Sequence, residues 1–326
     1  MNVRKLVLTS AAGCFSASLA LPALAQVIIM GTTTQGSLAY NTGVAISKVV
    51  SSKAGLQMRP QPLGGTSDYI PKINRKEVMF GPIVALDTFN AVRGNIDYSG
   101  KKQENLRIVG VAYPLRTGLV VPADSPIKTL SDLQKHKGLR VPAQYTSMKL
   151  IEQQVDMSLR LGGVKYDDFK KVPVSGFVQG MFALGQGKVD ISWISLGSAA
   201  GRKIDAQLRS RGGFRYLDVD LTPAGQAMLE KELPPVSVVL EKNVKMPGIK
   251  VPTRIFQQNM LILTHKDAPD EIVYKVAKVL ATEKMELAKS FGAFFRMDPK
   301  AVGTDPSAPY HPAAVKAYKE LGLKIR

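Results

Sequence analysis

Short apolar stretches alternate with segments of helical periodicity along most of the chain. The segments 27–30, 58–62, 106–112 and 118–121 have the length and apolar character of strands, whereas 37–53 repeats its apolar residues with a helical period. This alternation predicts a largely parallel sheet with helices packed on both of its faces. The expected fold class is therefore α/β.

The alternation occurs in two blocks. The first ends near Pro122, and a second series of strands and helices starts there. The segment 241–253 (EKNVKMPGIKVPT) has no periodicity and is typical of a loop or hinge. We predict two lobes, one of residues 26–121 plus 256–326 and one of residues 122–255. Each would hold a parallel-rich sheet flanked by helices, with a ligand cleft between the lobes.

The first 25 residues resemble a targeting segment. They begin with basic residues, continue with an apolar run and end in the small-x-small sequence ALA. This pattern is typical of a secretory signal peptide, so we expect cleavage after residue 25 and export to the periplasm. Two alternatives stay open: a transmembrane anchor, and a lipoprotein anchored at Cys14.

Cysteine content and charge narrow the range of functions. Cys14 is the only cysteine, so the exported chain would lack a thiolate metal site, a catalytic thiol and a disulfide framework. The formal net charge of +18 attracts anions. The basic residues are scattered and have few aromatic neighbours, which argues against nucleic acid as a partner. Three interpretations of the charge stay open. It steers a small anion to the protein, it steers the protein to an anionic surface, or it is simply a basic surface in contact with solvent.

Glycine and hydroxyl residues are concentrated where predicted strands give way to helices. Ligands bind beyond the carboxyl ends of the strands in an open parallel sheet, and the unpaired N–H groups of a helix start favour anions. Ser and Thr also cap helices without any ligand, but five such junctions in two lobes predict an anion-binding cleft. The candidate residues are Thr33, Thr34, Gln35, Ser37, Gly65 and Thr66 in the first lobe, and Gln144, Tyr145, Thr146, Ser147 and Ser195 in the second.

Signatures of nucleotide binding and of catalysis are weak. Ser37 stands where a phosphate loop needs a lysine. His136, His265 and His311 have no second ligand or nucleophile at a motif spacing, and no G-x-S-x-G elbow occurs. We therefore expect no enzyme activity, no cofactor and no metal ion. Capture of a solute by hinge closure remains the preferred function.

Two arginines are candidates for binding a carboxylate. Arg116 lies in AYPLRTGLVV and Arg254 in KVPTRIF, both near the predicted crossings between lobes. Either guanidinium has the geometry for a bidentate bond to a carboxylate. Arg116 is the favoured candidate, although an ordinary surface or inter-lobe role explains either residue.

Four segments together carry a resemblance. The segment GTTTQGSLAYNTGVAISK is a glycine-rich strand–helix junction, and PLGGTSDYIPKINRKEVMFG places a Gly/Thr/Ser turn before a helix. The centre, NLRIVGVAYPLRTGLVVPADSPIKTLSDLQKHKGLRV, and the final YHPAAVKAYKELGL are the most specific. In all four segments the chain resembles the TAXI family of substrate-binding proteins, which serve tripartite ATP-independent periplasmic (TRAP) transporters.

The resemblance implies a two-lobed periplasmic binding protein fold of type II. It also implies a receptor that closes on an amino acid, a keto acid or another carboxylate. The receptor would deliver this ligand to integral membrane TRAP permease subunits, which are driven by an ion gradient. A receptor of an ABC-type importer is the alternative within the binding class, and an exported enzyme is the alternative outside it. A monomer is expected, because a receptor must present itself to the permease.

Two departures from the family pattern concern the pocket. Residues 143–147 contain no glycine where the family often has a glycine-rich turn, and Val84 and Leu86 stand where it often has Gln-x-Asp. Larger side chains and fewer polar contacts favour a more apolar or aromatic carboxylate. Tyr145 would then cover the apolar part of that ligand.

Overall fold

The computed structural model describes residues 27–326. The predicted signal peptide lies outside this range and stays a prediction. The strands are β1 (Ile28–Thr32), β2 (Met58–Pro62), β3 (Phe80–Val84), β4 (Leu106–Pro122), β5 (Arg140–Ala143), β6 (Lys170–Pro173), β7 (Ser192–Ser195), β8 (Phe214–Tyr216), β9 (Ser237–Glu241) and β10 (Thr253–His265). The helices are α1 (Leu38–Ala54), α2 (Thr66–Asn74), α3 (Ala85–Arg93), α4 (Leu150–Leu161), α5 (Phe177–Gly185), α6 (Ala199–Gln207), α7 (Pro223–Glu232), α8 (Asp270–Thr282), α9 (Lys284–Ser290) and α10 (Pro312–Glu320).

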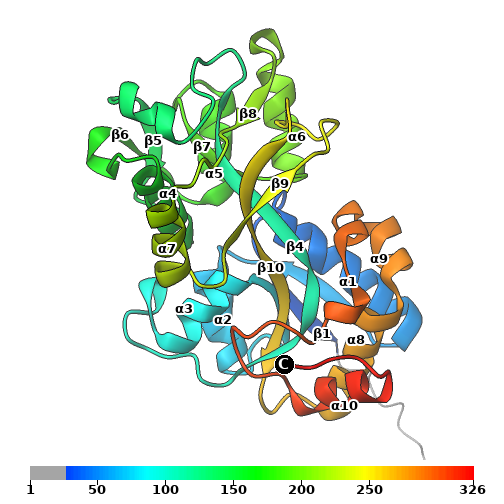
Figure 1. The fold of residues 1–326 in the computed structure, drawn as a ribbon. Coiled ribbons are helices and arrows are strands. Elements are labelled where there is room, and N and C mark those ends of the chain that lie inside the picture. Colours follow the sequence, from blue (N-terminus) through cyan, green and yellow to red (C-terminus); the bar gives the residue numbers. More distant parts are fainter. Residues whose placement is uncertain (1–26) are drawn as a thin grey trace, which may run out of the picture.

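Two long strands, β4 and β10, run through the middle of the molecule (Figure 1). They belong to a sheet with the order β2-β1-β3-β10-β4-β7, in which β8 also pairs with β4 and β9 with β10. The strand β1 is parallel to β2 and β3, whereas every pair made by β4 or β10 is antiparallel. A separate parallel pair joins β5 and β6. The sheet is thus more mixed than the strand–helix alternation predicted.

The strand β4 is continuous where the sequence predicted two strands, 106–112 and 118–121. Pro114 lies in its interior, opposite Asn259 of β10. The register between the two strands shifts nearby, between Met260 and Leu261. Proline is tolerated in a strand at such irregularities, because it has no N–H to donate to the ladder. Pairing with β10 therefore keeps β4 continuous at Pro114, although a proline by itself predicts the end of a strand.

Helices cover the sheet on both faces and give three apolar cores. The helices α1, α8, α9 and α10 pack on one face of β1, β3, β4 and β10, and α2 and α3 pack on the other. The third core is formed by residues between Leu119 and Phe256, together with Leu86. Within residues 27–326, no helix combines the length and apolar character needed to cross a bilayer.

The helix α1 is fixed by its two ends and by one glycine. The Ser37 side chain accepts a hydrogen bond from the Tyr40 N–H at the start, and Gly55 ends the helix with a φ of 66°. Gly43 faces β1 so closely that a Cβ atom there would lie 2.3 Å from Thr32 Cγ2. This close approach sets the position of the helix start, and with it Ser37, against the end of β1.

We predict that Gly43→Ala destabilises the protein. Alanine favours a helix by up to about 1 kcal/mol, but the clash with the stiff side chain of Thr32 should exceed this gain and give a net loss of about 1–3 kcal/mol. Urea unfolding measures the change. Lys48→Ala, at an exposed position of the same helix, is the control and should stay within about 0.5 kcal/mol of the wild type. An alanine variant as stable as the wild type would contradict the packing argument.

Candidate ligand-binding site

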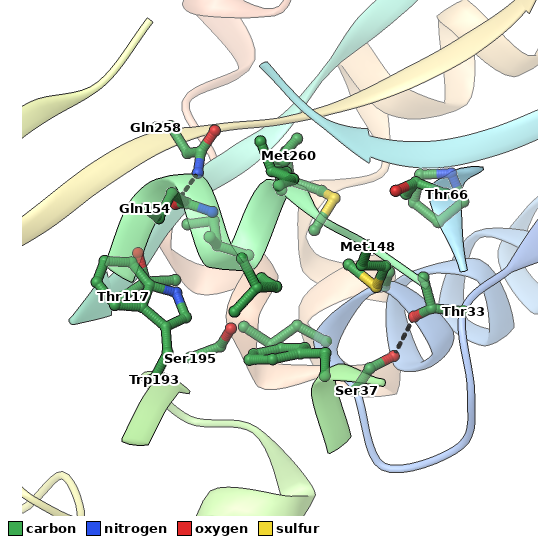
Figure 2. Close-up of a pocket in the computed structure, with 18 residues that line it drawn as sticks. Thr33, Ser37, Thr66, Thr117, Met148, Gln154, Trp193, Ser195, Gln258 and Met260 are labelled. Carbon is green, nitrogen blue, oxygen red and sulfur yellow. Dashed lines mark hydrogen bonds between the residues drawn. The ribbon is translucent and has the colours of Figure 1, made fainter. Parts of the chain in front are cut away.

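A cavity lies between the core around α1 and the core around α4 (Figure 2). Its volume is about 50 Å³, which is room for a few water molecules. Small-molecule sites have volumes of about 300–1,000 Å³, so a ligand of that kind fits only if the two sides of the cavity move apart. Its lining residues come from both sides of the molecule: Thr33, Ser37, Leu38, Ala39, Thr66, Pro82, Val84, Leu115, Thr117, Met148, Leu150, Ile151, Gln154, Phe177, Trp193, Ser195, Gln258 and Met260.

The starts of several helices converge on the cavity. Leu38 and Ala39 open α1, Thr66 opens α2, Leu150 opens α4 and Phe177 opens α5, and all five line it. The residues that precede α2, α4 and α5 supply no side-chain cap. The N–H groups and dipoles at the starts of α2 and α5 favour negative charge in the cavity. At the start of α4, the Asp97 carboxylate already accepts hydrogen bonds from the Lys149 and Leu150 N–H groups. None of the lining residues is charged.

Four polar side chains of the lining are hydrogen-bonded within the protein. The hydroxyls of Thr33 and Ser37 lie 2.6 Å apart. Gln258 Nε2 donates to Gln154 Oε1 at 3.0 Å, and Gln258 Oε1 accepts from the Leu86 N–H at 3.0 Å. Figure 2 shows both pairs at the cavity edge. These bonds hold the side chains in one orientation, and the glutamine pair joins β10 to α3 and α4.

Two other polar atoms of the lining have no partner. They are Thr117 Oγ1 and Trp193 Nε1, on residues that are 3% and 1% exposed. A buried donor or acceptor without a hydrogen bond costs about 1–3 kcal/mol. Such atoms in a cavity wall indicate where a ligand makes its polar contacts.

A buried acid, Asp87, lies behind Thr66. Its Oδ1 accepts a hydrogen bond from the Tyr98 hydroxyl at 2.9 Å. Burial raises the pKa of Asp87 to about 6, and hydrogen bonds from Thr66 and Tyr98 oppose that shift. The nearby carboxylate of Asp97 raises it further. The acid therefore changes its charge in the physiological range at the back of the cavity.

The two sides of the cavity also touch beyond the lining. Asn90 Nδ2 donates to Gln153 Oε1 at 3.0 Å, and the Ala200 N–H donates to the Gly36 carbonyl at 3.2 Å. The Met148 N–H lies 3.4 Å from Ser67 Oγ. These contacts keep the cavity enclosed.

Four of the residues predicted from the sequence line this cavity: Thr33, Ser37, Thr66 and Ser195. Thr34, Gln35 and Gly65 lie beside it in the same loops. Gly65 meets the second side directly, since a Cβ there would lie 3.3 Å from Ser147 Cβ. Whether these residues contact a ligand stays a prediction.

The remaining predicted residues are not part of the lining. Thr146 and Ser147 donate to the Ser175 carbonyl, at 2.7 and 3.2 Å. Gln144 is exposed and has a φ of 54°, and Tyr145 is buried in the core around α4. Their loop supplies Met148 to the cavity instead.

Both candidate arginines are bound by carboxylates of the protein itself. Arg116 pairs with Glu241 and donates from Nε to Gln257 Oε1 at 3.0 Å. Arg254 pairs with Asp218. Neither lines the cavity. In the described part of the chain, no group of three or more His, Cys, Asp and Glu residues is placed to hold a metal ion.

Four lining residues with polar side-chain atoms were not predicted from the sequence: Thr117, Gln154, Trp193 and Gln258. Thr117 was hidden because the two-strand prediction for β4 placed it in a break. Trp193 and Ser195 alternate along β7, which is a signal that they share one face of the sheet. Only their strand partner, β4, shows that this face turns toward the cavity.

Solved structures with this architecture define the class of fold. A periplasmic transporter protein has a TM-score of 0.54 at 14% identity and covers 91% of this chain and 92% of its own. The periplasmic binding protein BugD has a TM-score of 0.54 at 12% identity, covering 92% and 99%. Rpa4515 of R. palustris, solved with adipate, has a TM-score of 0.53 at 14% identity, covering 91% and 92%. The fold is that of a periplasmic binding protein, which confirms the predicted fold class.

A family model places the chain more narrowly. The model of the NMT1-like family matches residues 30–322, so the chain belongs to the NMT1-like family.

We predict that Asp87 makes the stability of the protein pH-dependent. The pKa of Asp87 is about 6 in the folded state, against an ordinary value of 3.8 for this side chain. The folded state therefore keeps a proton that the unfolded chain releases, and stability falls by about 3 kcal/mol between about pH 4 and pH 7. Asp87→Asn should remove this component and be more stable than the wild type at pH 7.5. Urea unfolding across this range measures it, and parallel profiles for the two proteins would contradict it.

Proposed function

We propose that the protein is an extracytoplasmic solute receptor that closes on a small organic anion and delivers it to a membrane permease. The observation that carries this proposal is the convergence of helix starts on an enclosed, largely apolar cavity. Unpaired helix N–H groups stabilise a carboxylate, and apolar walls exclude the water that would compete for it. The net charge of +18 draws anions toward the protein.

The ligand in this proposal is a carboxylate. Rpa4515, which shares the fold, is described with adipate, so this architecture accommodates carboxylates in at least one protein. Because no cation lines the cavity, neutral donors must balance the charge here. This favours a ligand with one carboxylate and an apolar body over a densely charged one.

The mechanism we propose is hinge closure of two lobes. Residues 26–121 plus 256–326 would move against residues 122–255, and β4 and β10 would bend where they pass between the cores. Thr117 of β4 and Gln258 of β10 lie at this level and line the cavity. The bonds from Asn90 to Gln153 and from Ala200 to Gly36 would form as the lobes close.

The proposed partner is a TRAP permease, because the sequence resembles the TAXI family in four segments. An ABC-type permease is the second candidate: a binding-protein component of an ABC phosphonate transporter from Pseudomonas aeruginosa shares the fold, with a TM-score of 0.51 at 12% identity, covering 82% of this chain and 78% of its own. Reconstitution with each type of permease distinguishes them, since only the correct one would accumulate solute in vesicles when the receptor is added.

The binding proposal is tested by calorimetry and thermal shift on residues 26–326. The protein is first unfolded and refolded so that any trapped ligand is removed. Carboxylates, keto acids and amino acids form the panel, and sugars and nucleotides are the controls. A ligand at 100 times its Kd adds about 2.7 kcal/mol of stability. Binding of sugars alone, or turnover of a carboxylate by the purified protein, would overturn the proposal.

We predict that a disulfide between the two sides blocks ligand exchange. In Gly65→Cys with Ser147→Cys the two Cβ atoms would lie about 3.3 Å apart, close to the separation of about 3.5–4.5 Å in natural disulfides. Met148 would shift slightly to make room. Since the chain from residue 26 has no other cysteine, the oxidised protein should neither take up nor release the best carboxylate from the screen.

Reduction should restore exchange in the double variant, and each single variant should bind in both redox states. Equal exchange rates in the oxidised and reduced double variant would show that ligand entry does not require separation of the lobes.

A further inference from the structure

Three polar side chains form a cluster at one end of the cavity. Trp193 and Ser195 lie two residues apart on β7 and so share a face, and Ser195 is directly opposite Thr117 of β4. All three line the cavity. Figure 2 shows this cluster on one side, with Thr33, Ser37 and Thr66 on the other and Met148 and Met260 between them.

The cluster has hydrogen-bonding capacity that the protein does not use. The indole of Trp193 packs against Phe256, with ring centroids 5.6 Å apart. Its Nε1 has no acceptor although the side chain is 1% exposed, and Thr117 Oγ1 has no partner either. An indole N–H is only a donor, whereas a hydroxyl is a donor or an acceptor. The group that completes the cluster must therefore contain a hydrogen-bond acceptor.

No charged side chain lines the cluster's end of the cavity. Arg116, next to Thr117 in the chain, pairs with Glu241 and does not line the cavity. The helix start that follows Ser195 is also occupied, because Ser198 Oγ accepts the Gly201 N–H and the Gly36 carbonyl accepts the Ala200 N–H. A carboxylate buried here would lose its hydration without a positive partner, which costs far more than burial of a neutral oxygen.

We infer that Trp193, Thr117 and Ser195 form a specificity subsite for a neutral oxygen of the ligand, such as a keto or hydroxyl group. This inference rests on the proposed function, which places the carboxylate at the helix starts beyond Met148 and Met260. The ligand is then an oxo- or hydroxy-monocarboxylate whose two polar ends are separated by an apolar body. Trp193 selects it against a dicarboxylate and against an unsubstituted fatty acid.

The experiment compares three series of linear acids that have four to eight carbons each. The first series carries a keto or hydroxyl group at the end far from the carboxylate, the second carries hydrogen there, and the third carries a second carboxylate. Isothermal titration of the refolded chain from residue 26 gives Kd values for every length. At the best length, the oxygenated acid should bind at least about 10-fold more tightly than both matched acids.

Substitutions then assign this preference to the cluster. Trp193→Phe keeps an aromatic ring against Phe256 but removes the donor, and Thr117→Val keeps the shape but removes the hydroxyl. Each should weaken binding of the oxygenated acid about 3- to 10-fold and leave the unsubstituted acid almost unchanged. Thr117→Ser should restore most of the preference.

Tyr216→Phe is the matched control, because its hydroxyl is bonded to the Ile194 carbonyl and does not line the cavity. It should leave the preference intact. If Trp193→Phe does not fold, the comparison of Thr117→Val with Thr117→Ser decides the matter alone.

The outcomes separate the inference from the proposed function. If dicarboxylates or unsubstituted acids bind best at every length, or if the preference survives both substitutions, the subsite is refuted while carboxylate capture stands. If no acid of any series binds and the broader panel of carboxylates fails as well, the proposed function falls and the inference falls with it.

Discussion

The antiparallel pairing of β4 with β10 is the constraint on which the rest of the molecule depends. Along β4, Leu115 belongs to one core and Leu119 to another, and Thr117 between them lines the cavity. Along β10, Gln258 stands in the same way between Phe256 and Met260. Because alternate residues share a face, two paired strands anchor both cores and still present polar groups to the space between them.

This placement explains how a basic protein has a cavity without a single cationic side chain. A buried guanidinium needs a carboxylate close by, or it costs several kcal/mol. The partly buried Arg116 has that partner within the protein, in Glu241, and the exposed Arg254 pairs with Asp218. Helix starts provide positive potential at a lower cost in desolvation free energy, since their N–H groups are part of the backbone and need no counter-ion. In the proposed receptor, neutral hydrogen bonds would discriminate the ligand, and the buried Asp87 would add a response to pH.

The periodicity of apolar residues predicted much of the secondary structure, because helix and strand formation depend mainly on residues close together in the sequence. The predicted strand 58–62 matches β2 to the residue, and 242–252 forms the expected irregular connection. The helix α7 was missed because it buries only Gly225 and Leu229 and so has almost no apolar period. Two of the predicted strand–helix junctions contribute residues to the cavity, Ser37 and Thr66, because the helices that start there begin at the cavity wall.

The sequence by itself determined the α/β class, most element boundaries and the glycine- and hydroxyl-rich loops that start helices, because propensity and periodicity act over a few residues. The tertiary structure alone decided which of those loops meet. It made β4 one strand and bonded Thr146 and Ser147 to the Ser175 carbonyl between β6 and α5. It also paired Arg116 with Glu241 across 125 positions of sequence and turned Trp193 and Thr117 toward the cavity. Strand register and the choice of hydrogen-bond and ion-pair partners depend on residues far apart in the sequence, so a local pattern does not predict them.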